Sequence, residues 1–279
     1  HNTLSQKFGH NLIYVPFHVQ KELIENAIKG AYSLNILGLN ITYPYKTQVM
    51  NYLVDIDDIA KQIGSVNTLV RFKNGYKGYN TDMPGLYRAL LSENIKVEGS
   101  EIIILGAGGA ARSATFMCAF YKANKVYLLN RTLEKAEKIA NEVNNFFRRN
   151  CIFPLKISDH SKLPNKKFFV IQATSVGLFP DVGNVVIDDE TFYEKIHTAL
   201  DLIYKPKETK FLRLVKQHGG KTLNGLKMLL YQGIIAYELW NEVSVSDEIA
   251  NSVLDELNKS WFLIKKNIKL LISIFNFVE

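Results

Sequence analysis

The spacing Gly106-x-Gly108-x-x-Ala111 is that of a turn that binds a dinucleotide. The first glycine permits a tight turn, and the second removes a Cβ where a pyrophosphate must approach. The helix that follows such a turn presents unpaired N–H groups and the positive end of its dipole to the phosphates. The alternative is a strand-to-helix turn without a ligand. An apolar strand before the turn and a helix after it favour the dinucleotide site.

The residues that follow the next strand indicate which dinucleotide is bound. NAD enzymes usually carry Asp or Glu about 20 residues past the glycines, where the carboxylate binds the ribose hydroxyls. This chain has Asn130-Arg131-Thr132 there, with Lys135 one turn later. Arg131 could bind a 2′-phosphate through two charge-assisted hydrogen bonds and also stack on adenine. The alternative is a solvated Arg and Lys, but cations are disfavoured at a helix N-terminus. The residues therefore favour NADP over NAD.

Three polar clusters precede the glycine turn. They are Asn40 to Lys46, Gly64 to Leu69, and Gly78 to Asp82. The first places a Lys just past a turn fixed by Pro44. Each cluster alone has an ordinary explanation as a solvated loop, a turn or a helix cap. Three such clusters in one small domain ahead of a nucleotide-binding unit indicate a catalytic site.

The elements that must position these residues alternate between strand and helix. The nucleotide-binding unit is expected to contain strands at 101–105, 125–129, 168–173 and 198–203, with helices at 112–123 and 133–147. The N-terminal third predicts a helix at 19–28, a strand at 34–42, a mostly helical segment at 47–63, and a hairpin of 66–70 with 76–80 around Asn74-Gly75. We therefore expect an α/β fold with two α/β domains and a cleft between them. The predicted ranges are a substrate domain at 1–82, a Rossmann-type NADP-binding domain at 83–224, and helices at 225–279 that return to the substrate domain.

Motifs along nearly the whole chain, in this order, resemble those of the shikimate dehydrogenase family. They are Asn40-x-Thr42-x-Pro44-x-Lys46, Gly64-x-Val66-Asn67-Thr68, Asn80-Thr81-Asp82, Gly106-Ala107-Gly108-Gly109-Ala110, Asn130-Arg131-Thr132, Ala173-Thr174-Ser175-x-Gly177, Asp201-x-x-Tyr204-x-Pro206-x-x-Thr209 and Gly225-x-x-Met228-Leu229-x-x-Gln232. The resemblance implies reversible, NADPH-dependent reduction of 3-dehydroshikimate to shikimate in the biosynthesis of chorismate and the aromatic amino acids.

The resemblance also implies a role for each matching residue. Lys46 and Asp82 would form the catalytic pair, which agrees with the need for a cationic donor at an oxygen that becomes an alkoxide. The ring hydroxyls would be held by Thr42, Asn67, Asp82 and Gln232, with Tyr204 near the substrate carboxylate. The pyrophosphate would bind Gly106, Ala107, Gly108, Gly109 and Ala110, and the 2′-phosphate Asn130, Arg131, Thr132 and Lys135. The nicotinamide side would be lined by Thr174, Leu202, Gly225 and Met228.

The sequence departs from the family's pattern at two places. A strand and a Ser-x-Ser-Pro turn that binds the substrate carboxylate come before His-Asn in the family, whereas this sequence opens at His1-Asn2. We expect a chain that starts there to bind NADP normally and shikimate weakly, because a buried carboxylate needs several donors. Gln172 stands where the family commonly has Asn. Two alternatives remain: an NAD-dependent quinate/shikimate dehydrogenase, and a catalytically impaired NADP-binding remnant.

Composition restricts the remaining classes. The formal charge of +7 comes from Lys and Arg spread along the chain, which suits solvated surface and anionic ligands better than nucleic acid. Cys118 and Cys151 are expected to be reduced thiols of a cytoplasmic protein, and no metal site is expected. The apolar runs between Trp261 and Val278 are too short to span a membrane, and a helix packed on the body is expected there. The oligomeric state is expected to be monomer or homodimer.

Overall fold

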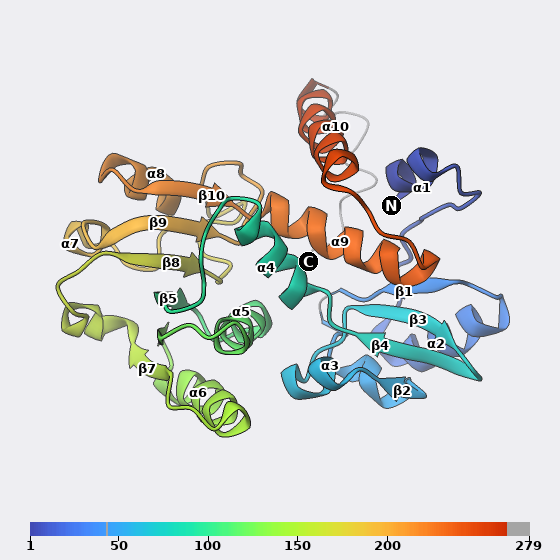
Figure 1. The fold of residues 1–279 in the computed structure, drawn as a ribbon, viewed down its shortest axis with the longest axis horizontal. Helices are drawn as coiled ribbons and strands as arrows, with labels where there is room; N and C mark the ends of the chain where they lie inside the picture. The colour runs from blue at the N-terminus through green and yellow to red at the C-terminus, as the bar shows by residue number, and fades with distance from the viewer. Residues whose placement is uncertain (43, 267–279) are drawn as a thin grey trace.

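The chain forms two sheets, each with helices packed on it (Figure 1). The structure is a computed structural model, and it describes residues 1–42 and 44–266, with side chains through Lys259. The apolar segment 267–279, for which a packed helix is predicted, lies outside the described residues. Within those residues, no helix is long and apolar enough to cross a membrane.

The larger sheet has six parallel strands in the order β10-β9-β8-β5-β6-β7. The strands are β5 (Glu101–Leu105), β6 (Lys125–Asn130), β7 (Ile152–Lys156), β8 (Phe168–Gln172), β9 (Ile196–Asp201) and β10 (Lys221–Asn224). The chain runs outward from β5 through β6 to β7, then returns to β8 on the other side. This order is that of a Rossmann-type sheet, in which ligands bind where the direction reverses, outside the carboxyl ends of β5 and β8.

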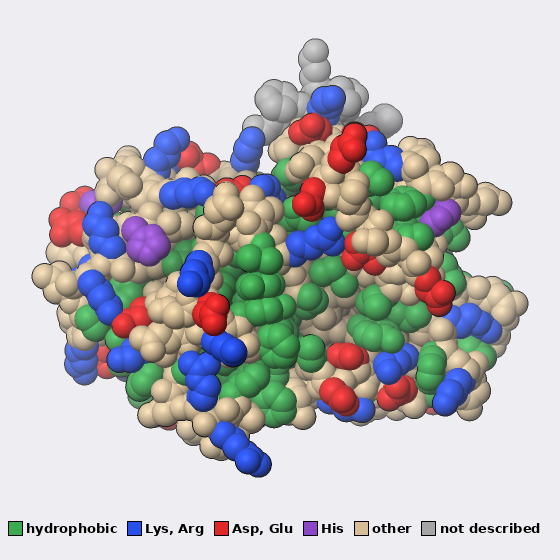
Figure 2. Space-filling view, in the orientation of Figure 1, with side chains coloured by type: hydrophobic (Ala, Val, Ile, Leu, Met, Phe, Trp, Pro, Cys, Tyr) green, Lys and Arg blue, Asp and Glu red, His purple; other side chains and the backbone are tan. Residues whose placement is uncertain are grey.

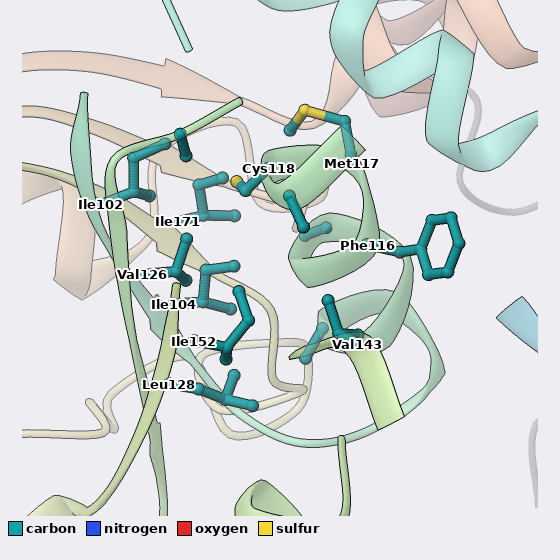
Figure 3. Close-up of a cluster of buried hydrophobic side chains, with 14 of the residues drawn as sticks. Ile102, Ile104, Phe116, Met117, Cys118, Val126, Leu128, Val143, Ile152 and Ile171 are labelled. Atoms are coloured by element: carbon teal, nitrogen blue, oxygen red, sulfur yellow. The ribbon is translucent and has the colours of Figure 1, made fainter. Parts of the chain in front are cut away.

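Helices cover both faces of this sheet because its central strands are apolar on both sides. On one face, α5 (Gly109–Phe120) and α6 (Leu133–Phe147) bury a cluster that includes Ile102, Ile104 and Val126 (Figure 3). The other face is covered by η3 (Ile157–Lys162), α7 (Glu190–Tyr193) and α8 (Lys210–Gln217). Cys118 and Cys151 belong to the first cluster as free thiols, and burial raises the pKa of both. Such thiols are unreactive.

The smaller sheet has the order β1-β3-β4-β2. The predicted hairpin is confirmed as β3 (Thr68–Phe72) and β4 (Gly75–Tyr79), with Phe72 paired to Gly75. The strand predicted at 34–42 is only β1 (Gly38–Asn40), because Leu34 caps the preceding helix and Asn35, at φ 57°, turns the chain. The segment 47–63, predicted to be mostly helical, contains η2 (Gln48–Tyr52) and α3 (Asp58–Ile63), with the short β2 (Asp55–Ile56) between them. The helix predicted at 19–28 starts later, as η1 (Lys21–Leu23) and α2 (Ile24–Ser33).

Two helices lie between the sheets in Figure 1, α4 (Asp82–Leu91) and α9 (Leu226–Asn241). They pack closely at Gly85, where an added Cβ would lie 2.6 Å from the backbone nitrogen of Gln232. At the far end of α9, Trp240 Nε1 donates a 2.8 Å hydrogen bond to the Leu69 carbonyl of the smaller sheet. Helices α10 (Asp247–Lys266) and α1 (Asn2–Phe8) contact each other beside α9. The predicted fold class is thus confirmed, including the return of the C-terminal helices, while the boundaries at 82/83 and 224/225 stay predictions.

Candidate active site

A cavity of about 510 Å³ lies between the two sheets and receives side chains from both parts of the molecule. Most residues predicted to act at the reaction centre line it: Thr42, Lys46, Asn67, Asp82, Leu202, Tyr204, Gly225, Met228 and Gln232. Ala110 is the one member of the predicted pyrophosphate group among the lining residues that the structure describes. Predicted site residues as far apart in sequence as Thr42 and Gln232 therefore share one cavity.

Lys46 and Asp82 form an ion pair inside this cavity. The Nζ of Lys46 lies 2.7 Å from Oδ2 of Asp82, with side chains 33% and 16% exposed. Lys46 lies in the turn at 44–47, and its carbonyl accepts a 2.8 Å hydrogen bond from the Val66 amide. Asp82 is the first residue of α4, where the helix dipole favours a carboxylate. The backbone thus fixes both ends of the pair.

Asn67 holds the second oxygen of Asp82. Its Nδ2 donates to Asp82 Oδ1 at 2.9 Å and to Thr81 Oγ1 at 3.0 Å, and its Oδ1 accepts from the Thr81 amide at 2.7 Å. Asn67 is 3% exposed, so these bonds form in a site of low dielectric. The carboxylate of Asp82 therefore has one oxygen on an amide and the other on an ammonium, which fixes its orientation. Asn67, predicted to hold substrate hydroxyls, also orients Asp82.

Asn40 and Tyr14 line the cavity but were not predicted as site residues. The Oδ1 of Asn40 accepts hydrogen bonds from Tyr14 Oη at 3.1 Å and from His1 Nε2 at 2.9 Å. Its Nδ2 donates to the carbonyl of Asn67 and the hydroxyl of Thr68, both at 3.3 Å. The signal for Asn40 was its place as the first residue of a recognised motif. Tyr14 belongs to no motif, so only the fold brings it to the site.

The glycine turn follows β5 at the reversal point of the larger sheet. Gly106 has φ +115°, and an added Cβ would lie 2.9 Å from Thr174 Cγ2 and 3.0 Å from the Ala173 carbonyl oxygen. Protein packing therefore requires a glycine at this position. At Gly108 and Gly109 an added Cβ would meet nothing within 4 Å. Packing does not explain those two glycines, whereas the approach of a pyrophosphate does, so the turn fits the dinucleotide it was predicted to bind.

Two buried polar side chains hold the loops on the other side of the reversal point. Gln172 ends β8, is fully buried, accepts from the Thr174 amide at 2.7 Å and donates to the Val176 carbonyl at 3.0 Å. Gln172, which stands where the family commonly has Asn, therefore shapes the loop that carries Thr174. Asp201 ends β9 beside it, since the two are paired in register.

Asp201 fixes the loop that carries Leu202 and Tyr204. Its Oδ1 accepts from the Ile203 amide at 3.0 Å, and its Oδ2 accepts from Thr209 Oγ1 at 2.6 Å. A Cβ added to Gly225 would lie 2.1 Å from the Leu202 carbonyl oxygen, so only glycine lets α9 start against this loop. Burial raises the pKa of Asp201 to about 6, even though both hydrogen bonds stabilise the carboxylate.

This raised pKa gives a testable dependence of stability on pH. The unfolded chain titrates Asp201 near its ordinary pKa, 3.8, and the folded chain near 6, so the folded state binds the proton more tightly. Between these values the free energy of unfolding falls as pH rises, by at most about 3 kcal/mol for a shift of about two units. Asp201→Asn cannot ionise and keeps one acceptor. We expect the stability of the variant relative to the parent to increase between pH 4.5 and pH 7.5, as measured by urea unfolding. A difference that is equal at both pH values would show that the pKa is not raised.

The predicted 2′-phosphate residues lie at the carboxyl end of β6, apart from the cavity. Asn130 Nδ2 donates to the Thr132 carbonyl at 2.8 Å and so shapes the turn into α6. Arg131, Thr132 and Lys135 are exposed. In the described part of the chain, neither Arg131 nor Lys135 has an acidic partner, so both guanidinium and ammonium are available to an anion. On the face shown in Figure 2, Lys and Arg side chains are scattered among acidic ones and form no single basic patch.

Comparison with known proteins was made for sequence and for structure. Residues 1–69 match the family model described as the shikimate dehydrogenase substrate binding domain. A shikimate dehydrogenase (NADP(+)) of Caldanaerobacter subterraneus subsp. tengcongensis is 40% identical over 240 residues, which cover 86% of this chain and 85% of the relative. One from Methanocaldococcus jannaschii is 37% identical over 262 residues, 93% of this chain and 92% of the relative.

Solved structures agree. A crystal structure of a shikimate dehydrogenase in complex with NADP+ superposes with a TM-score of 0.82 at 35% identity, covering 91% of this chain and 88% of the other. The shikimate 5-dehydrogenase of Thermus thermophilus, in complex with NADP(H) and shikimate, gives a TM-score of 0.79 at 27% identity, covering 91% of this chain and 92% of the other. Both similarities extend over the two sheets and the cavity between them.

Proposed function

The chain belongs to the shikimate dehydrogenase family, and on that premise we propose that it catalyses the reversible, NADPH-dependent reduction of 3-dehydroshikimate to shikimate. The reaction is a step of chorismate and aromatic amino acid biosynthesis. The observation that carries the proposal is the Lys46–Asp82 ion pair inside a cavity that both sheets line. We observe nothing in the described residues that favours an NAD-dependent quinate/shikimate dehydrogenase or an impaired remnant.

The groups around the cavity suit this chemistry. Bound NADPH supplies the hydride that the ring carbonyl carbon accepts. Lys46 would donate a hydrogen bond and then a proton to the carbonyl oxygen as it gains negative charge, leaving shikimate with a hydroxyl. Asp82 would orient the Lys46 ammonium through the 2.7 Å contact and accept a hydrogen bond from a substrate hydroxyl. In the direction of oxidation, Lys46 would take the same proton back.

Substrate and cofactor are assigned to the predicted residues. The ring hydroxyls would meet Thr42, Asn67, Asp82 and Gln232, and the carboxylate would meet Tyr204, all of which line the cavity. NADP would lie from the Gly106–Ala110 turn to the carboxyl end of β6, with Arg131 and Lys135 at its 2′-phosphate. Thr174, Leu202, Gly225 and Met228 would line the nicotinamide side. We further propose a cytoplasmic location, as suits a biosynthetic enzyme with small diffusible substrates, and a monomer or a homodimer.

A two-by-two assay tests the function. Shikimate and quinate are each offered as substrates with NADP and with NAD, and formation of the reduced cofactor is followed by absorbance. We expect the shikimate–NADP combination to give the highest kcat/KM of the four. A higher value with quinate or with NAD would contradict the proposed substrate or cofactor. No turnover with any combination would contradict the proposed activity.

A further inference from the structure

We propose that Lys156 is a third cation of the 2′-phosphate site and that it increases the preference of this chain for NADP over NAD. The inference rests on the proposed function, because it concerns the cofactor of the same reaction. Lys156 lies outside every motif recognised in the sequence and is separated from Arg131 by the whole of α6. Only the pairing of strands brings the two together.

The register of the larger sheet places Lys156 beside the predicted site. β6 and β7 are parallel neighbours whose last residues, Asn130 and Lys156, are paired. Neighbouring strands lie about 4.8 Å apart, and side chains at paired positions leave the same face of the sheet. Asn130 is already a predicted residue of the site. The side chain of Lys156 therefore begins one strand spacing from it, on the same face.

That face is the one covered by α6. Four residues earlier on each strand, Val126 pairs with Ile152, and both belong to the cluster buried under α5 and α6. Side chains alternate along a strand, so Asn130 and Lys156 point to this same side. α6 begins at Leu133 and contacts both β6 and β7. Its first turn, with Lys135, thus lies at the ends of both strands.

The charges at this edge are unbalanced. Arg131, Lys135 and Lys156 are all exposed, and within the described residues none of the three forms an ion pair. Lys162, by contrast, is paired with Asp159 at 3.2 Å. The acids closest in sequence are Glu134 and Glu137 on α6, and in the described part of the chain neither forms an ion pair with Arg131, Lys135 or Lys156. Three exposed cations at one end of the sheet repel each other, and a bound dianion reduces that repulsion.

The chemistry of the ligand matches this arrangement. A 2′-phosphate carries close to two negative charges and three acceptor oxygens at neutral pH, so it can be bound by several cations at once. NAD has a neutral hydroxyl at the same position. The Lys side chain is a point charge on a flexible four-carbon stem, so Lys156 can reach the phosphate without a change in the backbone. Its contribution should appear with phosphorylated adenosine only.

Calorimetric titration with adenosine 2′,5′-bisphosphate and with adenosine 5′-monophosphate tests the proposal. Lys156→Gln should raise the Kd for the bisphosphate about three- to tenfold, as for one partly solvated charge-assisted contact, and leave the Kd for the monophosphate unchanged. The bisphosphate effect should shrink at higher salt, because exposed charges are screened. The matched control is Lys167→Gln, which removes another exposed charge just before the amino end of the central strand β8, at the opposite end of the strands from the 2′-phosphate site. This control should leave both affinities unchanged.

Two results would overturn the assignment. An unchanged Kd for the bisphosphate would mean that Lys156 does not reach the phosphate. An equal loss for both ligands, or a loss as large in Lys167→Gln, would mean that the charge acts on the nucleotide as a whole. The titration needs no substrate and no turnover. Failure of the proposed function would instead appear as absence of shikimate oxidation while the 2′-phosphate is still bound.

Discussion

Lys46→Met is expected to lower kcat about 10²–10⁴-fold and to change the KM for shikimate little, which is the range for loss of a general acid or base. Methionine keeps the length of the side chain and cannot donate a proton or a hydrogen bond. The ammonium acts mainly on charge that develops in the transition state, so the loss should fall on kcat. Steady-state kinetics of shikimate oxidation with NADP measure both quantities.

Two controls separate loss of catalysis from a general effect of removing a lysine and from misfolding. Lys29→Met removes an exposed ammonium that is paired to Glu25 within α2, far from the cavity, and should leave kcat unchanged. Thermal unfolding of Lys46→Met should show a folded protein, because Lys46 is not buried and contributes one ion pair. A folded Lys46→Met protein with near-normal turnover would remove Lys46 from the catalytic pair.

Arg131→Ala is expected to raise the KM for NADP about 10- to 100-fold while changing that for NAD little. A charge-assisted hydrogen bond to phosphate contributes about 1.5–3 kcal/mol, and each 1.4 kcal/mol is tenfold in affinity. The exposed guanidinium has no competing acidic partner in the described residues, so its loss should not destabilise the fold.

The comparison of the two cofactors is the informative part of this experiment. Stacking of Arg131 on adenine would be lost equally with both cofactors, whereas the contact with the 2′-phosphate would be lost with NADP alone. Arg213→Ala, on α8 at the other face of the sheet, removes an exposed Arg as a control and should change neither KM. Equal losses for NADP and NAD in Arg131→Ala would show that Arg131 does not recognise the phosphate.

The nucleotide-binding sheet was predictable because its central strands are continuous apolar runs and its glycines have fixed spacing. The helix at 133–147 was predicted with its observed bounds. The helix predicted at 112–123 is α5, which starts three residues earlier, at Gly109, because the end of the glycine turn is already helical. The two edge strands were missed. β7 contains Pro154, which argues against a strand, and β10 has four residues, of which only Leu223 is apolar. Edge strands are only partly buried, so their sequences carry a weak pattern.

The residues that line the cavity were largely predictable as a set, but their connections were not. Sequence motifs placed Lys46, Asn67 and Asp82 together without indicating that Asn67 holds Asp82. The same is true of Asp201, which was known only as the first residue of a motif. Its hydrogen bonds to Ile203 and Thr209 lie within that motif, but the motif does not say which of its residues are bonded. The burial of Asp201 depends on the pairing of β9 with β8, which is earlier in the sequence.

The close crossing of α4 and α9 has a consequence for how this enzyme could acquire a new substrate. Asp82 is the first residue of α4, and Gly225 and Met228 are at the start of α9, so this closely packed pair of helices sets the distance between Asp82 and the residues proposed to line the nicotinamide side. Tyr204, which faces the substrate carboxylate in our proposal, is on a separate loop held by Asp201. Selection or design could therefore vary residues of the 202–208 loop to accept a different acid while the geometry of hydride and proton transfer is inherited unchanged.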